Sequence, residues 1–131
     1  MVALESARDQ LVGDLEVFRS SQAIAGGPVP TAVITSFEYC HDLAIKVIRR
    51  LLEQTEPPRH VQAMDIPTLM CTAAKHGLVD DPAAWLTYRE LRDPLPHVSN
   101  EGMPLDPTRL LPDFVTSVTA LLAACAETFR S

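Results

Sequence analysis

The sequence predicts an all-α protein, an up-and-down antiparallel helical bundle of four to five helices, and three observations predict it. Five segments repeat apolar residues at spacings of three and four, which is the period of an amphipathic helix. No segment alternates apolar and polar residues convincingly, as a half-buried strand does. Most of the eleven prolines stand at the boundaries of the five segments, where an antiparallel bundle has its short connectors.

The first two helices are expected at residues 3–23 and 31–55. The apolar stripe of the first includes Leu4, Leu11 and Phe18, and two glycines with two prolines at 26–30 end it. The stripe of the second helix runs from Val33 to Leu51 and is widened by further apolar residues. We therefore expect the second helix to contact more than one neighbour.

The remaining three helices are marked by their ends. The third is expected at 66–76, with Asp65 as N-cap and Gly77 at the C-terminal end. The fourth begins after Asp81, with proline at its first position, and is interrupted by the prolines at 94 and 96. The fifth follows Pro107 and has the clearest apolar stripe. These signals predict the elements in order.

Length and composition predict one domain, residues 1–131. The chain is shorter than about 150 residues, the usual size of a domain. Hydrophobic residues make up 47% of it, which is enough for one core without disulfides. The thiols of Cys40, Cys71 and Cys125 lack C-x-x-C spacing and stand among apolar residues, so we expect all three to be buried. The four histidines are not spaced as metal ligands. We expect neither a metal nor a cofactor.

The charge balance excludes several classes of protein. Eleven Lys and Arg against seventeen Asp and Glu leave a net charge of −6, so the chain lacks the basic surface needed for non-specific nucleic-acid binding. A nucleotide, or an RNA held at one local cationic site, remains compatible with this balance. No charge-free apolar stretch approaches the ~20 residues of a spanning helix, and the N-terminus has no signal core. These features predict a cytoplasmic protein without a membrane segment.

The densest group of chemically useful residues lies at 89–101, where the fourth helix ends. Arg92 and His97 would lie about 140° apart on an unbroken helix, but the intervening prolines allow them to converge. Guanidinium can hold phosphate oxygens and imidazole can move a proton near neutral pH. A solvated helix end with local ion pairs is the alternative interpretation.

Several other residues have a structural interpretation. Glu38 and Asp42 stand one helical turn apart, and we expect them to bond to Arg or Lys of a neighbouring helix rather than to a metal. His41 is expected as a buried histidine with its hydrogen bonds satisfied, and Trp85 as a core or interface residue. Lys46, together with Arg49 and Arg50, either faces a nucleotide cleft or lies on a solvated face.

Three segments resemble one known family. Residues 37–46 (FEYCHDLAIK) are similar to the F-E-φ-x-φ-[ED]-L-A-W-K signature of the nucleotidyltransferase substrate-binding proteins of the HEPN superfamily, where φ is apolar. Residues 73–81 (AAKHGLVDD), followed by Trp85, resemble its A-x-x-x-G-L-I-x-D…W segment. Arg92 and His97 match its R-x-x-x-x-H motif, and Asn100 with Glu101 follows. The resemblance covers about residues 31–125, in the family's order.

The resemblance implies both a partner and a site. Proteins of this family are helical bundles that commonly form homodimers, and many act with a minimal nucleotidyltransferase, often as the toxin half of a toxin–antitoxin pair. In ribonuclease members, the Arg and His cleave RNA without a metal, which gives Arg92 and His97 as candidate catalytic residues. The candidate substrate-binding residues are Lys46, Arg89, Ser99 and Asn100.

The chain departs from the family's pattern within the R-x-x-x-x-H region. Asp93 replaces the Asn that follows the Arg, Ser99 replaces a Tyr, and two prolines lie inside the motif. These changes favour a substrate-binding subunit that associates with a nucleotidyltransferase. The alternatives are a metal-independent endoribonuclease, with Arg92 and His97 at a dimer interface, and an inactive helical interaction module.

Overall fold

The computed structural model describes residues 2–25, 31–92 and 107–130, and every element in these ranges is an α-helix, as the sequence predicts. In chain order, the helices are α1 (Val2–Ala25), α2 (Thr31–Leu52), α3 (Pro58–Ala63), α4 (Ile66–Lys75), α5 (Pro82–Arg92) and α6 (Pro107–Arg130).

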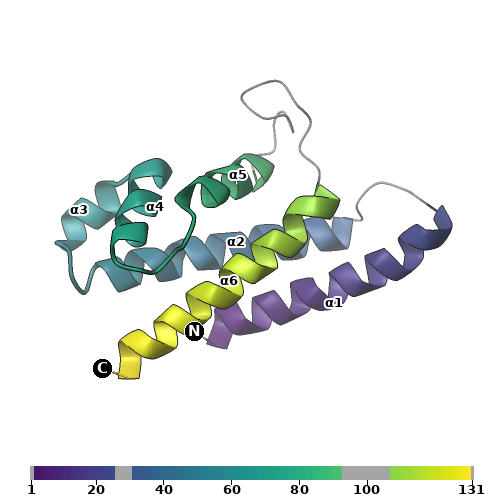
Figure 1. Ribbon diagram of the computed structural model, residues 1–131, viewed down its shortest axis with the longest axis horizontal. Helices are drawn as coiled ribbons and strands as arrows, with labels where there is room; N and C mark the ends of the chain where they lie inside the picture. The colour runs from purple at the N-terminus through teal and green to yellow at the C-terminus, as the bar shows by residue number, and fades with distance from the viewer. Residues whose placement is uncertain (1, 26–30, 93–106, 131) are drawn as a thin grey trace.

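The four longer helices reverse direction from one to the next, which makes the expected up-and-down arrangement (Figure 1). α1 packs along α2, and α6 crosses both of them. α5 lies on the side of α2 away from α1, and the short helices α3 and α4 precede it at one end of α2. α2 therefore contacts every other helix, as its widened apolar stripe predicts.

One helix more is present among the described residues than the expected four to five. The sequence interpretation leaves a connector between α2 and α4, whereas α3 forms there, with Pro57 as its N-cap and Pro58 in its first turn. Proline cannot continue a helix but fits the first turn of the next one, where its missing N–H would have no partner within the helix. The two prolines therefore begin α3, whereas α2 already ends at Leu52, before the expected residue 55.

The expected starts of α4 and α5 are confirmed, and so is the glycine expected after α4. The Asp65 carboxylate accepts a hydrogen bond from the Thr68 N–H at 2.9 Å, which caps α4. Gly77 follows α4 with a φ of +75°, a backbone conformation that glycine adopts without steric cost. At the start of α5, the Asp81 carboxylate accepts from the Ala84 N–H at 3.3 Å. Local sequence therefore determines where both helices begin.

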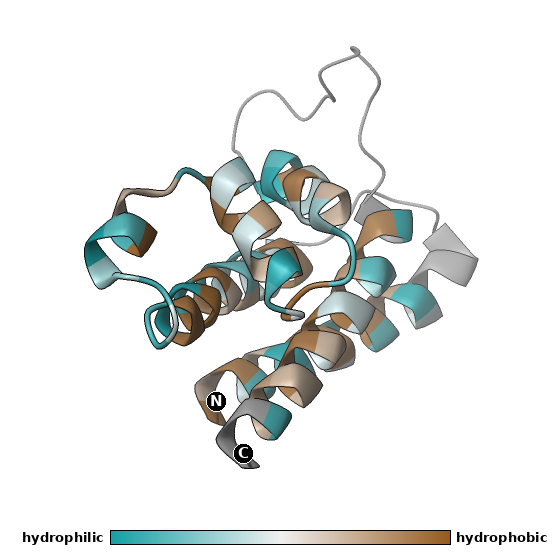
Figure 2. Ribbon diagram, turned by 60° about the vertical axis from the view of Figure 1, so that its left-hand side comes forward, coloured by the Kyte–Doolittle hydropathy of each residue, from teal (hydrophilic) through white to brown (hydrophobic). Residues whose placement is uncertain are grey.

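The core consists of the apolar stripes of the helices, which face one another inside the bundle. Each long helix carries both apolar and polar residues around its circumference (Figure 2). α1 contributes Leu4, Leu11 and Phe18, all at most 5% exposed, and Trp85 of α5 is buried as expected. Cys40 and Cys125 are buried too, but the expectation for Cys71 is wrong because that residue is exposed. The short α4 buries Leu69, Met70 and Ala73 instead.

Within the described ranges, one stretch of α6, Arg109–Glu127, is long and apolar enough by composition to cross a membrane, with a mean hydropathy of 1.4. Its Leu111, Phe114, Val118 and Leu121 are fully buried in the bundle. The core helix of a helical bundle has the same composition, so this stretch is only a weak indication of a membrane segment. The absence of such a segment stays a prediction.

Candidate functional site

The structure places some of the candidate site residues and not others. Arg89 and Arg92 lie in the last turn of α5, and Lys46 lies on α2. His97, Ser99 and Asn100 are outside the residues that the structure describes. The convergence of Arg92 with His97 therefore stays a prediction. The described part of the site lies on α2 and α5.

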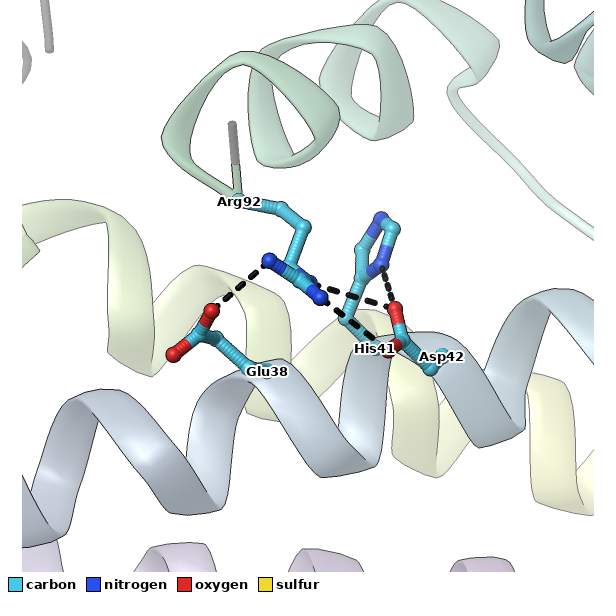
Figure 3. Close-up of polar contacts among 4 residues, drawn as sticks. All are labelled: Glu38, His41, Asp42 and Arg92. Atoms are coloured by element: carbon cyan, nitrogen blue, oxygen red, sulfur yellow. Dashed lines mark hydrogen bonds and ion pairs between the residues drawn. The ribbon is translucent and has the colours of Figure 1, made fainter. Parts of the chain in front are cut away.

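Arg92 bridges α5 to two carboxylates on α2 (Figure 3). Its Nη1 donates to Oε2 of Glu38 at 2.7 Å. Its Nε and Nη2 donate to the two oxygens of Asp42, at 3.2 and 3.3 Å. All three guanidinium nitrogens thus bond to acids one helical turn apart, and the Asp42 pair is bidentate. The expectation that Glu38 and Asp42 pair with a basic residue of a neighbouring helix is confirmed.

The imidazole of His41 lies directly beside this ion pair. It is fully buried, and its Nδ1 lies 3.3 Å from Oδ1 of Asp42, the oxygen that also accepts from Nε of Arg92 (Figure 3). Nε2 of His41 is buried without a hydrogen-bond partner among the described residues. The expectation of a fully satisfied histidine is therefore wrong for the described part of the chain. The missing partner for Nε2 has a physical reason, because the rings of Phe37 and Phe114 lie beside the imidazole and offer no hydrogen-bonding group.

Those rings form an aromatic cluster that positions α5 over α2. Phe114 of α6 lies edge-on to Phe37 of α2, with ring centroids 4.9 Å apart, and to Tyr88 of α5, at 5.2 Å. Trp85 joins from the preceding turn of α5 at 5.8 Å from Phe114. The hydroxyl groups of Tyr88 and Ser117 lie 2.9 Å apart and tie α5 to α6. This packing determines where the last turn of α5, and so Arg92, meets α2.

Charge and burial act in opposite directions on the two groups beside Arg92. Burial lowers the pKa of His41, and the positive charges of Arg89 and Arg92 lower it further, against the effect of Asp42. Partial burial acts to raise the pKa of Asp42, but hydrogen bonds from Arg92 and His41 bring it below its ordinary value. At neutral pH the site therefore contains a neutral imidazole, an ionised Asp42 and a charged guanidinium.

The other cations of α2 have different roles. Lys46 and Arg50 are exposed, which agrees with a solvated face. Arg49 instead donates from Nη1 to the carbonyl oxygens of Val61 and Met64, at 2.8 and 3.2 Å. It therefore ties α2 to the end of α3. Sequence reasoning missed this contact because the pattern did not predict α3.

The donor set of the described residues does not suggest a metal centre. In the ranges 2–25, 31–92 and 107–130, no group of three His, Cys, Asp or Glu side chains lies close enough together to hold a metal ion. His76, which follows α4, pairs at 3.1 Å with Glu56, which follows the C-terminal end of α2. The described chemistry is that of a guanidinium held by two acids at the junction of two helices.

Comparisons with known proteins agree with the earlier resemblance. A family model described as "Nucleotidyltransferase substrate binding protein like" matches residues 3–127. The curated protein "Probable ribonuclease HepT" of Haemophilus influenzae is 22% identical over 112 residues, which cover 85% of this chain and 77% of that protein. No solved structure matches the chain significantly.

Proposed function

Because the chain belongs to the family of nucleotidyltransferase substrate binding protein-like proteins, we propose that it is a HEPN-type substrate-binding subunit that associates with a minimal nucleotidyltransferase. The match from residue 3 to 127 includes almost the whole bundle, so it does not depend on one short motif. A role as the HEPN half of a toxin–antitoxin-like pair, acting in the cytoplasm, is part of the same proposal.

One observation supports this function best: two signature segments that are distant in sequence meet at the same point. Glu38 and Asp42 belong to the segment at 37–46, and Arg92 begins the R-x-x-x-x-H motif. These residues are 54 and 50 positions apart in the chain but are joined by hydrogen bonds. The motifs therefore act as one site, in which the acids orient the guanidinium at the end of α5.

The charges at this junction favour binding over cleavage. Two carboxylates neutralise Arg92 and would compete with a phosphate for its hydrogen bonds. Exposed Lys46 on α2 and exposed Arg89 on α5 supply further positive charge on the two helices that Arg92 joins. This pattern suits a nucleotide or a partner surface with a few local charges. It suits a long polyanion less, since the chain has a net charge of −6.

A second candidate function is a metal-independent endoribonuclease, in which Arg92 and His97 of two copies meet at a homodimer interface. The printed name of the Haemophilus influenzae relative, a probable ribonuclease, favours it. In such a reaction an imidazole moves protons while a guanidinium stabilises the negative charge that develops on the oxygens around the phosphorus. Asp93, Ser99 and the prolines within the motif are arguments against it.

Co-expression with a minimal nucleotidyltransferase tests the proposed function. We expect the two proteins to elute together from a sizing column, and we expect Arg92→Met to weaken the complex. Arg50→Met is the matched control, because it removes an exposed cation of α2 that has no ion pair with the described residues. Elution of the wild-type proteins as two separate species would contradict the proposal.

Incubation of the purified protein with RNA in EDTA tests the second candidate. Cleavage by the wild type that is lost in His97→Ala would make the nuclease the better assignment, whereas intact RNA would exclude it. Light scattering provides an independent check. A measured mass near 14.4 kDa, that of a monomer, would exclude a catalytic site formed by two copies of the chain. The substrate-binding role would then be the remaining candidate.

A further inference from the structure

His41 is a polar group in the apolar part of the bundle. Its side chain is 0% exposed, and its ring centroid lies 5.9 Å from that of Phe37 and 6.3 Å from that of Phe114. Its one hydrogen bond among the described residues links Nδ1 to Oδ1 of Asp42, while Nε2 has no partner there. Buried polar atoms without a partner are rare in folded proteins, so this arrangement needs a physical explanation.

The hydrogen bond determines which ring nitrogen carries the proton. An ionised Asp42 can only accept a hydrogen bond, and two donors of Arg92 already keep it ionised. Nδ1 of His41 must therefore be the protonated nitrogen, and Nε2 is then an acceptor without a partner among the described residues. Such an unsatisfied acceptor costs about 1–3 kcal/mol of stability. An apolar ring at this position would avoid that cost but would not donate to Asp42.

Asp42 has the most exposed side chain of the three residues in the ion pair with Arg92 and Glu38, so packing restrains its orientation least. Its side chain is 49% exposed, so solvent rather than packing surrounds about half of it. The imidazole of His41 is immobilised in the core and donates to the oxygen that receives Nε of Arg92. A carboxylate held in this way keeps both oxygens facing the guanidinium, while Glu38 binds Nη1.

We propose that His41 is a positioning residue for Arg92: its Nδ1–H fixes the carboxylate of Asp42 so that the guanidinium is held in one orientation at the end of α5. The charged groups that act on His41 are Asp42 on its own helix and Arg89 and Arg92 on α5. The link to substrate rests on the proposed function, in which Arg92 is the central cation of the site. The hydrogen-bonded chain itself does not depend on that function.

The tautomer of His41 in the wild-type protein is the first test. Long-range ¹H–¹⁵N correlation spectra of the folded, full-length chain at neutral pH distinguish a protonated Nδ1 from a protonated Nε2. We expect the Nδ1–H form, with that proton exchanging slowly with water. A His41 that is protonated on Nε2, or an Nδ1 proton that exchanges as fast as that of the exposed His60, would overturn the proposal.

The second test compares two substitutions at this position. His41→Phe keeps an aromatic ring and removes the donor, whereas His41→Asn places a side-chain amide where Nδ1 lies and can still donate. We expect the Nε–H of Arg92 to exchange with water at least about threefold faster in His41→Phe than in the wild type, because the loss of one hydrogen bond loosens the carboxylate that holds it. We expect His41→Asn to restore most of the protection.

The results separate a positioning role from a packing role. The proposal would be overturned if the Nε–H of Arg92 exchanged with water at the same rate in the wild type and in a folded His41→Phe protein. A residue that only fills space would affect the stability of the protein but not the exchange of that proton. If His41→Phe does not fold, exchange in His41→Asn that is about threefold or more faster than in Arg50→Met would also count against it. A failure of the chain to bind a nucleotidyltransferase would leave these spectra unchanged, so the two proposals fail independently.

Discussion

The ion pair between Arg92 and Glu38 should stabilise the bundle measurably, and a double-mutant cycle can isolate its contribution. Arg92→Met keeps the aliphatic part of the side chain, and Glu38→Gln keeps the shape of the carboxylate. The cycle consists of the wild type, both single variants and the double variant. Its coupling energy reports the interaction across the 2.7 Å contact between Nη1 and Oε2.

The structure limits the size of this coupling. Two unit charges about 4 Å apart attract by about 1 kcal/mol in water and about 4 kcal/mol at the effective dielectric constant of a protein surface. The side chains of Arg92 and Glu38 are 27% and 36% exposed, so solvent screening keeps the coupling near the lower value. We expect about 1 kcal/mol, which corresponds to about 3–5 °C in Tm for a chain of this length.

Urea unfolding followed by circular dichroism provides the assay, at low salt and at about 1 M salt, where the Debye length falls to about 3 Å. The coupling should shrink at high salt, and the dependence of the free energy on urea should be equal in all four proteins. Arg50→Met, which removes an exposed cation of α2, should change stability by less than about 0.5 kcal/mol.

A coupling of zero within error would refute this reasoning, and so would a coupling that is the same at both salt concentrations. Either result would mean that the contact in Figure 3 does not hold the end of α5 against α2. The position of Arg92 would then depend on the aromatic cluster alone.

Three further predictions concern other groups. Arg49→Met should destabilise the protein by about 1–2 kcal/mol, because it removes two hydrogen bonds to the carbonyl groups at the end of α3; a cost no larger than that of Arg50→Met would contradict the contact. Since burial lowers the pKa of His41 from 6.5, the unfolded chain binds a proton more readily below that pH, so the free energy of unfolding should fall as pH falls through this window. His41→Phe should lack this part of the pH dependence, and an unchanged slope would contradict the assignment. A thiol reagent at pH 8 should modify Cys71 quickly, whereas Cys40, whose pKa is raised to about 12 by burial, and Cys125 should react only on unfolding; more than one fast thiol per native chain would be inconsistent with the fold.

The helices were predictable because the signals that define them are local. Asp65 and Asp81 stand at helix starts, each followed by a proline or an apolar run, and both cap as expected. The apolar spacing from Val33 to Leu51 places one face of α2 in the core, whatever packs against it. The errors arose where a local signal has two meanings. A pair of prolines can mark the end of one helix or the start of the next, and here Pro57 and Pro58 start α3. An apolar neighbourhood does not determine the face on which Cys71 lies.

The sequence alone thus determined the helical class and most helix ends. It also predicted that the acidic pair at 38 and 42 bonds to a basic residue of a neighbouring helix. Only the tertiary structure decided that this partner is Arg92, 50 and 54 residues away, and that His41 supports the pair from a fully buried position. The physical reason is range: helix periods and caps depend on residues within about four positions, whereas pairing between helices depends on how the whole core packs. Phe114, which belongs to none of the signature segments, brings α5 to the part of α2 where these groups meet.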